Sequence, residues 1–253
     1  MPLLEDPAHL ALTKALRRLG ARLARPSAIV VVSAHWEADP VRVTTGATPP
    51  LLYDYQGFAP QAYNLQYPAP GEPALAAQIV AGLTEAGIAC EPDAYRGFDH
   101  GLFVPLSLMF PTADVPCVQV SLQAGLSAVA HQRIGEALGS LTHPDLLIVG
   151  SGFTFHNMPA FFGRRAPDHT ALNLAFEAWL RETVCSVDMA QPQRLARLAG
   201  WAQAPGGRYA HPREEHLMPL LVCQAAARRP ASALESVPVL GVQCSNIEWW
   251  ADP

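Results

Sequence analysis

Two spacings of hydrophobic positions alternate along the chain, one typical of buried strands and the other of amphipathic helices. Short apolar runs predict strands at residues 28–34, 115–121, 146–149 and 237–244, with a half-exposed strand at 41–45. Apolar residues at helical spacing predict helices near residues 12–23, 75–83, 134–141, 172–180 and 214–228. The alternation predicts an α/β fold, with a central, mostly parallel or mixed sheet flanked by helices.

The composition fits one compact body of enzyme size. Of the 253 residues, 50% are hydrophobic and 15% are charged, a balance that excludes an intrinsically disordered protein. The chain has no internal repeat, low-complexity tract or linker, so we predict a single domain over residues 1–253. The net charge of −5 provides no basic surface for nucleic acid, and no apolar run is long enough for a membrane span.

The cysteines and the first residues indicate a cytoplasmic protein. Five cysteines, an odd number, are scattered without Cys-x-x-Cys spacing, which predicts reduced thiols in the core. The start, Met-Pro-Leu-Leu-Glu-Asp, has neither the basic residues nor the apolar centre of a signal peptide.

A long segment at residues 48–73 interrupts the alternation of helices and strands. It is rich in proline, glycine and tyrosine. Long loops in compact domains tend to be functional, so we predict a lid over an aromatic substrate pocket. The alternative is that its aromatic side chains simply cover an edge of the sheet.

Histidines occur in four separate segments where a strand or a loop ends. Open α/β sheets bind ligands outside the carboxyl ends of their strands, and neutral imidazole is a good ligand for Fe(II) or Zn(II). The candidates are His35 after the run 28–34, His156 after the strand at 146–149, His100 in Phe-Asp-His-Gly at 98–101, and His216 at the start of the helix at 214–228.

Each candidate histidine also has a purely structural interpretation. His35 would be a buried histidine packed by Trp36, and His216 would be solvent-exposed at a helix start. His156 would cap the following turn together with Asn157. Four other histidines, which lie on predicted helices or polar turns, are expected to be solvated: His9, His131, His143 and His169.

Polar residues beside these histidines have two interpretations as well. His211 fits a helix N-cap or a partner of a ligand better than a ligand, because Pro212 suits the first position of a helix. Asp99 either orients His100 or starts a turn. Glu214 and Glu215 would complement the dipole of the helix that they begin.

Taken together, the motifs resemble those of the class III extradiol ring-cleavage dioxygenases. The likeness is greatest to the DOPA 4,5-dioxygenase type, which is related to the catalytic chain of protocatechuate 4,5-dioxygenase. It covers nearly the whole chain in order, at residues 28–37, 67–71, 97–101, 115–121, 150–152 with 156–157, and 211–212 with 215–216.

The resemblance implies a reaction and roles for the four histidines. His35 and His216 would bind a mononuclear non-haem Fe(II), for which Zn(II) can substitute in the isolated protein. His156 would be the acid/base residue, and His100 would line the same pocket. A small aromatic diol of the catechol type and O2 would be the substrates, a ring-opened semialdehyde would be the product, and the resemblance is compatible with a homo-oligomer.

One part of the family pattern has no counterpart in this sequence. The resemblance implies a first strand and a His-Gly-Ser-Pro turn before Met1–Asp6, whose histidine is a further metal ligand. Without it, His100, Glu37 or Glu215 would complete the metal site. Two other functions therefore stay open: a non-catalytic metal- or ligand-binding protein on the same scaffold, and a zinc-dependent hydrolase.

Overall fold

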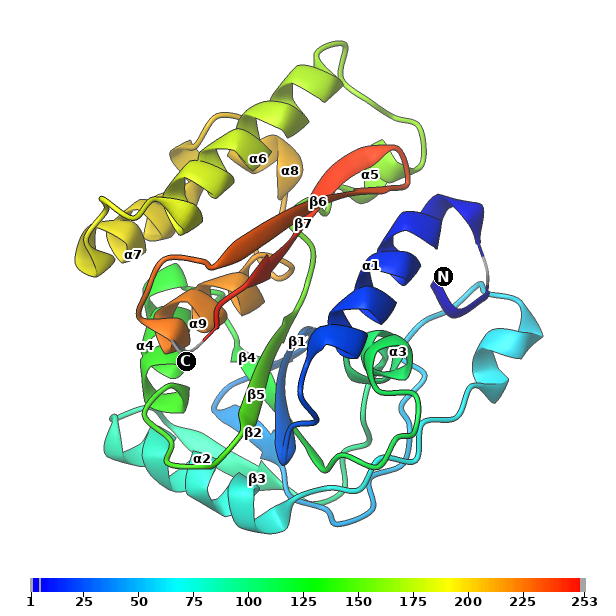
Figure 1. The fold of residues 1–253 in the computed structure, drawn as a ribbon, viewed down its shortest axis with the longest axis vertical. Helices are drawn as coiled ribbons and strands as arrows, with labels where there is room; N and C mark the ends of the chain where they lie inside the picture. Colours follow the sequence, from blue (N-terminus) through cyan, green and yellow to red (C-terminus); the bar gives the residue numbers. More distant parts are fainter. Residues whose placement is uncertain (1, 5, 251–253) are drawn as a thin grey trace.

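A five-stranded mixed sheet forms the centre of the protein. A computed structural model of the chain describes residues 2–4 and 6–250. The strands lie in the order β3-β2-β4-β1-β5 (Figure 1). Their bounds are Ala28–Ala38 (β1), Val41–Thr44 (β2), Cys90–Asp93 (β3), Cys117–Gln123 (β4) and Leu146–Ser151 (β5).

The directions of the strands confirm the predicted fold class, an α/β protein with a mostly parallel, mixed sheet. Strand β1 pairs in parallel with both β4 and β5, and β2 pairs in parallel with β3. Among the described strands of this sheet, the antiparallel contact joins β2 to β4. Strand β1 is thus the central strand of the parallel part, which explains why its sequence is a continuous apolar run rather than an alternating one.

Helices cover both faces of the sheet. Their bounds are Leu10–Arg22 (α1), Pro73–Glu85 (α2), His100–Met109 (α3), Ala128–Leu138 (α4), Met158–Phe161 (α5), His169–Cys185 (α6), Gln191–Ala199 (α7), Gly207–Ala210 (α8) and Met218–Ala227 (α9). In the part of the chain that the structure describes, short 3-10 turns lie at Pro2–Leu4, Pro7–His9, Pro60–Asn64 and Trp201–Gln203.

The two faces of β1 bury their side chains in two different hydrophobic clusters. Val30 and Val32 pack with residues of α2, α4 and α9, whereas Ile29 and Val31 pack with residues of α3. This division follows from the alternation of side chains along a strand. Both faces therefore hold β1 in place, and with it the residues at its carboxyl end.

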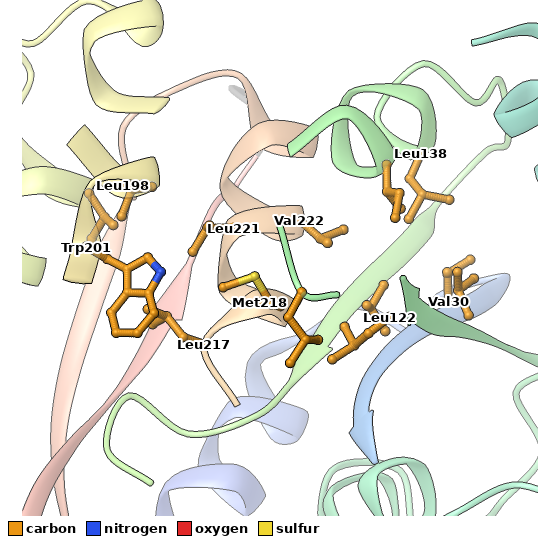
Figure 2. Packing of buried hydrophobic residues seen from close by; sticks show 14 of the residues in the cluster. Val30, Leu122, Leu138, Leu198, Trp201, Leu217, Met218, Leu221 and Val222 are labelled. Atoms are coloured by element: carbon orange, nitrogen blue, oxygen red, sulfur yellow. The ribbon is translucent and has the colours of Figure 1, made fainter. Parts of the chain in front are cut away.

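Helix α9 connects the sheet to the C-terminal third of the chain. Figure 2 shows Met218 and Val222 on the side of Leu122 and Leu138, while Leu217 and Leu221 lie toward Trp201. All four α9-segment residues are fully buried. The segment just before α9 is consequently held from both sides.

Strand β1 is longer than the predicted 28–34, and its pairing changes where the prediction ends it. Ser33 pairs with Ser121, but the next pair along β4 is Glu37 with Leu122. Three residues of β1 therefore oppose none on β4, as in a bulge, which bends a strand and redirects side chains. His35 is the middle residue of the three.

The single last strand predicted at 237–244 is wrong, because a turn at residues 240–241 divides this range. Its two ends belong to the two strands of a hairpin, Ala233–Val239 (β6) and Val242–Glu248 (β7). Leu240 and Gly241 have φ values of 51° and 81°, so both occupy the left-handed region that a two-residue hairpin turn requires. Leucine is a rare residue there, which hid the turn in the sequence.

The helix predicted at 214–228 begins only at Met218, and residues 212–217 form turns before it. Pro219 gives the physical reason, since proline is tolerated in the first turn of a helix but not further along. Glu214, Glu215 and His216 therefore precede the helix.

The expectation that four further histidines are solvated is wrong for two of them. His131 is fully buried, and its ring bridges the Ser127 carbonyl and the backbone N–H of Gln123, so it ties α4 to the end of β4. His169 is also buried and bonds the Tyr209 hydroxyl at 2.7 Å. His9 and His143 are half-buried.

All five cysteines are free, and Cys117, Cys223 and Cys244 are buried, as the sequence predicts for core thiols. Within residues 2–4 and 6–250, no helix has the length and apolar character that crossing a bilayer requires.

Two helical glycines allow a test of the packing between α4 and α9. A Cβ atom at Gly135 of α4 would overlap the carbonyl oxygen of Val222, whereas one at Gly82 of α2 would lie 3.8 Å from Leu141. We expect Gly135→Ala to lower the free energy of unfolding by about 1–3 kcal/mol through overpacking. The same substitution at Gly82 is the matched control and should raise it by about 0.5–1 kcal/mol. Urea unfolding followed by circular dichroism measures both, and equal effects would contradict the close approach.

Candidate active site

Four histidines from four distant segments come together at the carboxyl end of β1. The ring centroids of His35 and His216 lie 4.9 Å apart, and that of His100 lies 3.8 Å from His35. His156 stacks on His216 at 3.4 Å with an interplanar angle of 21°. The structure thus brings together all four histidines that the sequence singled out, in the row His100, His35, His216, His156.

His35 lies in the interrupted part of β1 and is anchored through its backbone. Its N–H donates to the hydroxyl of Ser33 at 3.2 Å, and that hydroxyl donates to Asp99 at 2.9 Å. A Cβ atom at Gly101 would overlap the Ser33 hydroxyl and lie 3.0 Å from the His35 ring. Glycine at this position lets the start of α3 approach β1 closely.

Asp99 caps α3 and does not orient His100. Its carboxylate accepts the Gly101 N–H at 3.0 Å and also accepts from Arg96 and from the side chain of Gln119 on β4. Complete burial, followed by the nearby charge of Asp54, raises the pKa of Asp99 above its usual value despite these donors. Of its two interpretations, starting a turn holds.

The partner of His100 is Asp54, a residue that the sequence analysis missed. One carboxylate oxygen of Asp54 lies 2.7 Å from Nδ1 of His100 and accepts the backbone N–H of His100 at 3.1 Å. Asp54 is the only acidic side chain in residues 51–67, which we call the aromatic segment. An isolated carboxylate between Tyr53 and Tyr55 was the available signal.

The aromatic segment borders this end of the site. The Tyr55 ring packs edge-on against His100 at 5.4 Å, and the Tyr53 ring lies 5.8 Å from Phe103 of α3. The hydroxyls of Tyr53 and Tyr55 donate to carbonyls of the segment itself, at Leu65 and Ala62. The segment therefore presents ring surfaces rather than hydroxyls to α3 and His100, and the lid stays a prediction.

A chain of charged groups lies at the other end of the row. Nδ1 of His156 is 3.2 Å from one oxygen of Glu215, and Arg213 is 3.3 Å from the other. Arg213 also binds both oxygens of Glu37, the second-last residue of β1, at 2.7 and 2.6 Å. Glu37 is thus engaged by Arg213, while Glu215 faces the histidines.

Burial keeps the two central imidazoles neutral. Burial, and after it the charge of His100, lowers the pKa of His35 to about 3. Burial, and then the charges of the neighbouring histidines, lowers the pKa of His216 well below its usual value. Neutral imidazole is the form that binds a metal.

Two separate sets of donor atoms have metal-site spacing. His35, Asp54 and His100 form one set, and His156, Glu215 and His216 form the other, with the donor atoms of each set within 4.8 Å of one another. The Nδ1 atom of His216 is buried and has no hydrogen-bond partner, nor has the Glu215 oxygen that faces Arg213. Buried atoms without a partner are rare and costly, so this site suits a cation.

His211 and Asn157 hold the segments around His156 through hydrogen bonds. His211 is fully buried, follows the end of α8 and bonds the Thr154 carbonyl at 2.9 Å, so its predicted N-cap role is wrong. Asn157 caps α5 by accepting the Ala160 N–H at 3.1 Å. The turn-capping role that was an alternative for His156 thus belongs to Asn157.

Comparison with known proteins agrees with this geometry. Residues 5–242 match the family described as the catalytic LigB subunit of aromatic ring-opening dioxygenase. The chain belongs to the LigB family. It is thus an extradiol ring-opening dioxygenase by family, an oxidoreductase, and the predicted resemblance is confirmed.

Named relatives within the LigB family cover most of this chain. A protein named dioxygenase tasH from Hapsidospora irregularis is 37% identical over 90% of this chain and 74% of its own length. Proteins named 4,5-DOPA dioxygenase extradiol are 36% identical in Beta vulgaris, over 83% of this chain and 76% of that one, and 33% identical in Escherichia coli K12, over 98% and 88%. The crystal structure of an uncharacterized Escherichia coli K12 protein matches with a TM-score of 0.72 and 30% identity, over 92% of this chain and 90% of that one.

The buried histidine behind the site makes the stability of this LigB-family protein depend on pH. Burial lowers the pKa of His211 to about 3, while in the unfolded chain it stays near 6.5. Between these values the unfolded state binds more protons, so the free energy of unfolding falls as the pH falls below 6.5. We expect His211→Gln to reduce the loss between pH 7 and pH 5 by about 1–2 kcal/mol. Urea unfolding of metal-free protein at both pH values measures it, and equal losses in the two proteins would contradict the assignment.

Proposed function

We propose that this protein is a non-haem Fe(II)-dependent extradiol dioxygenase that inserts O2 into a catechol-type ring and gives a ring-opened semialdehyde. The observation that carries the proposal is the approach of His35 and His216 to a ring-centroid distance of 4.9 Å, with His100 and His156 on either side. The relatives named 4,5-DOPA dioxygenase extradiol support a catechol as the substrate class.

His35 and His216 would hold the metal, and Glu215 would be the third ligand. Two histidines and one carboxylate on one side of the ion leave open positions for substrate and O2, an arrangement used by non-haem Fe(II) oxygenases. The unpartnered Nδ1 of His216 supports this choice, and so does the Glu215 oxygen that accepts no hydrogen bond and is only ion-paired with Arg213 at 3.3 Å. Glu37 is excluded by its two bonds to Arg213. The bond of His100 to Asp54 uses only Nδ1 and does not exclude His100; we choose Glu215 because its donor atom groups with that of His216 and completes a set of two histidines and one carboxylate. Zn(II) would occupy the same donors in the isolated protein.

When bound, Fe(II) supplies redox chemistry toward O2 and polarises the oxygens of the diol. The protein supplies positioning and proton transfer. His156 donates through Nδ1 to the ionised Glu215, which leaves Nε2 free to take a proton from a substrate hydroxyl and to return it later. His100 would line the substrate pocket at the opposite end of the histidine row, where its ring packs against Tyr55 of the aromatic segment.

The cellular setting follows from the thiols. Five free cysteines, three of them buried, support a reducing compartment, and we place the protein in the cytoplasm.

Oxygen uptake tests the reaction. Protein loaded anaerobically with Fe(II) should consume one O2 for each catechol opened and form a yellow product, across a panel of catechols with different ring substituents. An oxygen electrode and absorbance spectra measure both. Substrate binding without oxygen uptake would indicate a binding protein, and hydrolysis of an ester or amide by the Zn(II)-loaded protein without oxygen uptake would indicate a hydrolase.

Single substitutions separate metal ligands from the acid/base residue. His35→Ala, His216→Ala and Glu215→Ala should each sharply lower the bound metal measured by plasma mass spectrometry. His156→Ala should keep most of the metal and lower kcat about 10²–10⁴-fold, the usual contribution of a positioned proton-transfer group. Full metal content in any of the first three variants would remove that residue from the ligand set, and full activity of the last would refute the acid/base role.

A further inference from the structure

Two histidine–carboxylate pairs flank the candidate metal ligands. His156 and Glu215 form the pair beside His216, and His100 and Asp54 form the pair beside His35. The first pair lies on the turns around residues 156 and 215. The second joins the start of α3 to the aromatic segment, 46 residues earlier in the chain.

We infer that Asp54 is a positioning residue for His100: its carboxylate fixes the orientation and tautomer of the ring, so that Nε2 of His100 is a proton acceptor next to His35. The inference rests on the proposed function for its catalytic consequence, and on the contacts of Asp54 for everything else.

The contacts of Asp54 determine which nitrogen of His100 carries the proton. An ionised carboxylate only accepts hydrogen bonds, so Nδ1 at 2.7 Å must donate. Burial raises the pKa of Asp54, but the hydrogen bonds and charge of His100 outweigh it and hold this pKa below its usual value, so the carboxylate is ionised. With the proton on Nδ1, the lone pair lies on Nε2.

The same carboxylate oxygen also fixes the position of the ring. It accepts the backbone N–H of His100 at 3.1 Å, so one atom holds both the first residue of α3 and its side chain. The ring is packed between His35 at 3.8 Å and Tyr55 at 5.4 Å. Rotation of the ring would break the bond to Asp54, which therefore selects one orientation.

Asp54 does not hold the aromatic segment in place by itself. The N–H of Leu52 donates to the carbonyl of Phe98 at 2.8 Å, and the Tyr67 hydroxyl donates to the carbonyl of Phe110 at 3.1 Å. The hydroxyls of Tyr53 and Tyr55 bond within the segment. Substitution of Asp54 should therefore leave the segment folded and act mainly on His100.

Nitrogen NMR of the Zn(II)-loaded protein tests the tautomer without any activity measurement. Long-range 15N spectra at a pH where the ring is neutral should show His100 with protonated Nδ1 and unprotonated Nε2; loss of its signals in His100→Ala assigns them among the nine histidines. In Asp54→Ala the ring should shift toward the Nε2-protonated tautomer, which free imidazole side chains prefer. An Nε2-protonated ring in the unsubstituted protein, or no change in Asp54→Ala, would overturn the inference.

Steady-state kinetics of the Fe(II)-loaded protein tests the consequence. Asp54→Ala should lower kcat about 10–100-fold, as loss of a partner that orients an active-site histidine does, with a much smaller change in KM. Asp54→Asn should recover part of kcat, because its amide oxygen can still accept from Nδ1. In a His100→Ala background, Asp54→Ala should have no further effect.

Gln56→Ala is the matched control, since Gln56 is exposed on the same segment. It should change neither the spectra nor kcat. A loss confined to KM, or equal losses from Asp54→Ala with and without His100, would show that Asp54 acts through the segment and would reject the positioning role. If the unsubstituted protein opens no ring, the proposed function fails while the NMR result still decides the inference.

Discussion

The site depends on one buried carboxylate, that of Asp99, which joins three elements at the carboxyl end of the sheet. It accepts hydrogen bonds from Ser33 of β1, from Gln119 of β4 and from the first turn of α3. Burying a carboxylate is costly unless it is fully hydrogen-bonded, so each donor must keep its position. The same contacts set the distance between His35, whose backbone N–H is bonded to the Ser33 hydroxyl, and His100, which follows Asp99.

The remaining half of the site is held by packing instead. His216 comes directly before Leu217 and Met218, which are fully buried between the sheet and the C-terminal helices. His156 donates its backbone N–H to the Ala210 carbonyl at 2.9 Å, so its loop is tied to the segment that carries Glu215. The end of the histidine row with His35 and His100 is thus held by hydrogen bonds to the buried Asp99 side chain. The end with His216 is held by packing in the hydrophobic core.

The sequence predicted the fold class and the four histidines, because long apolar runs and strand-end histidines are local signals. What it could not predict depends on contacts between distant residues. Asp54 stands 46 positions from His100, and Arg213 stands 176 positions from Glu37. His131 looked solvated because the Gln123 backbone that it bonds belongs to a different element. Two residues in unusual local positions also caused wrong predictions. Leu240 lies in a left-handed turn that its residue type does not indicate, and Pro219 marks a helix start that was predicted earlier in the chain.

The continuity of His216 with the first residues of α9 has a thermodynamic consequence. A ligand that favours one arrangement of His216 also favours the arrangement of Leu217 and Met218 in the core, so binding and folding share free energy through the backbone. Alterations to α9 that never contact the four histidines would then change occupancy of the site, and a filled site would make the opening of α9 less favourable. The cation affinity that we propose would thus be partly a property of the hydrophobic interior.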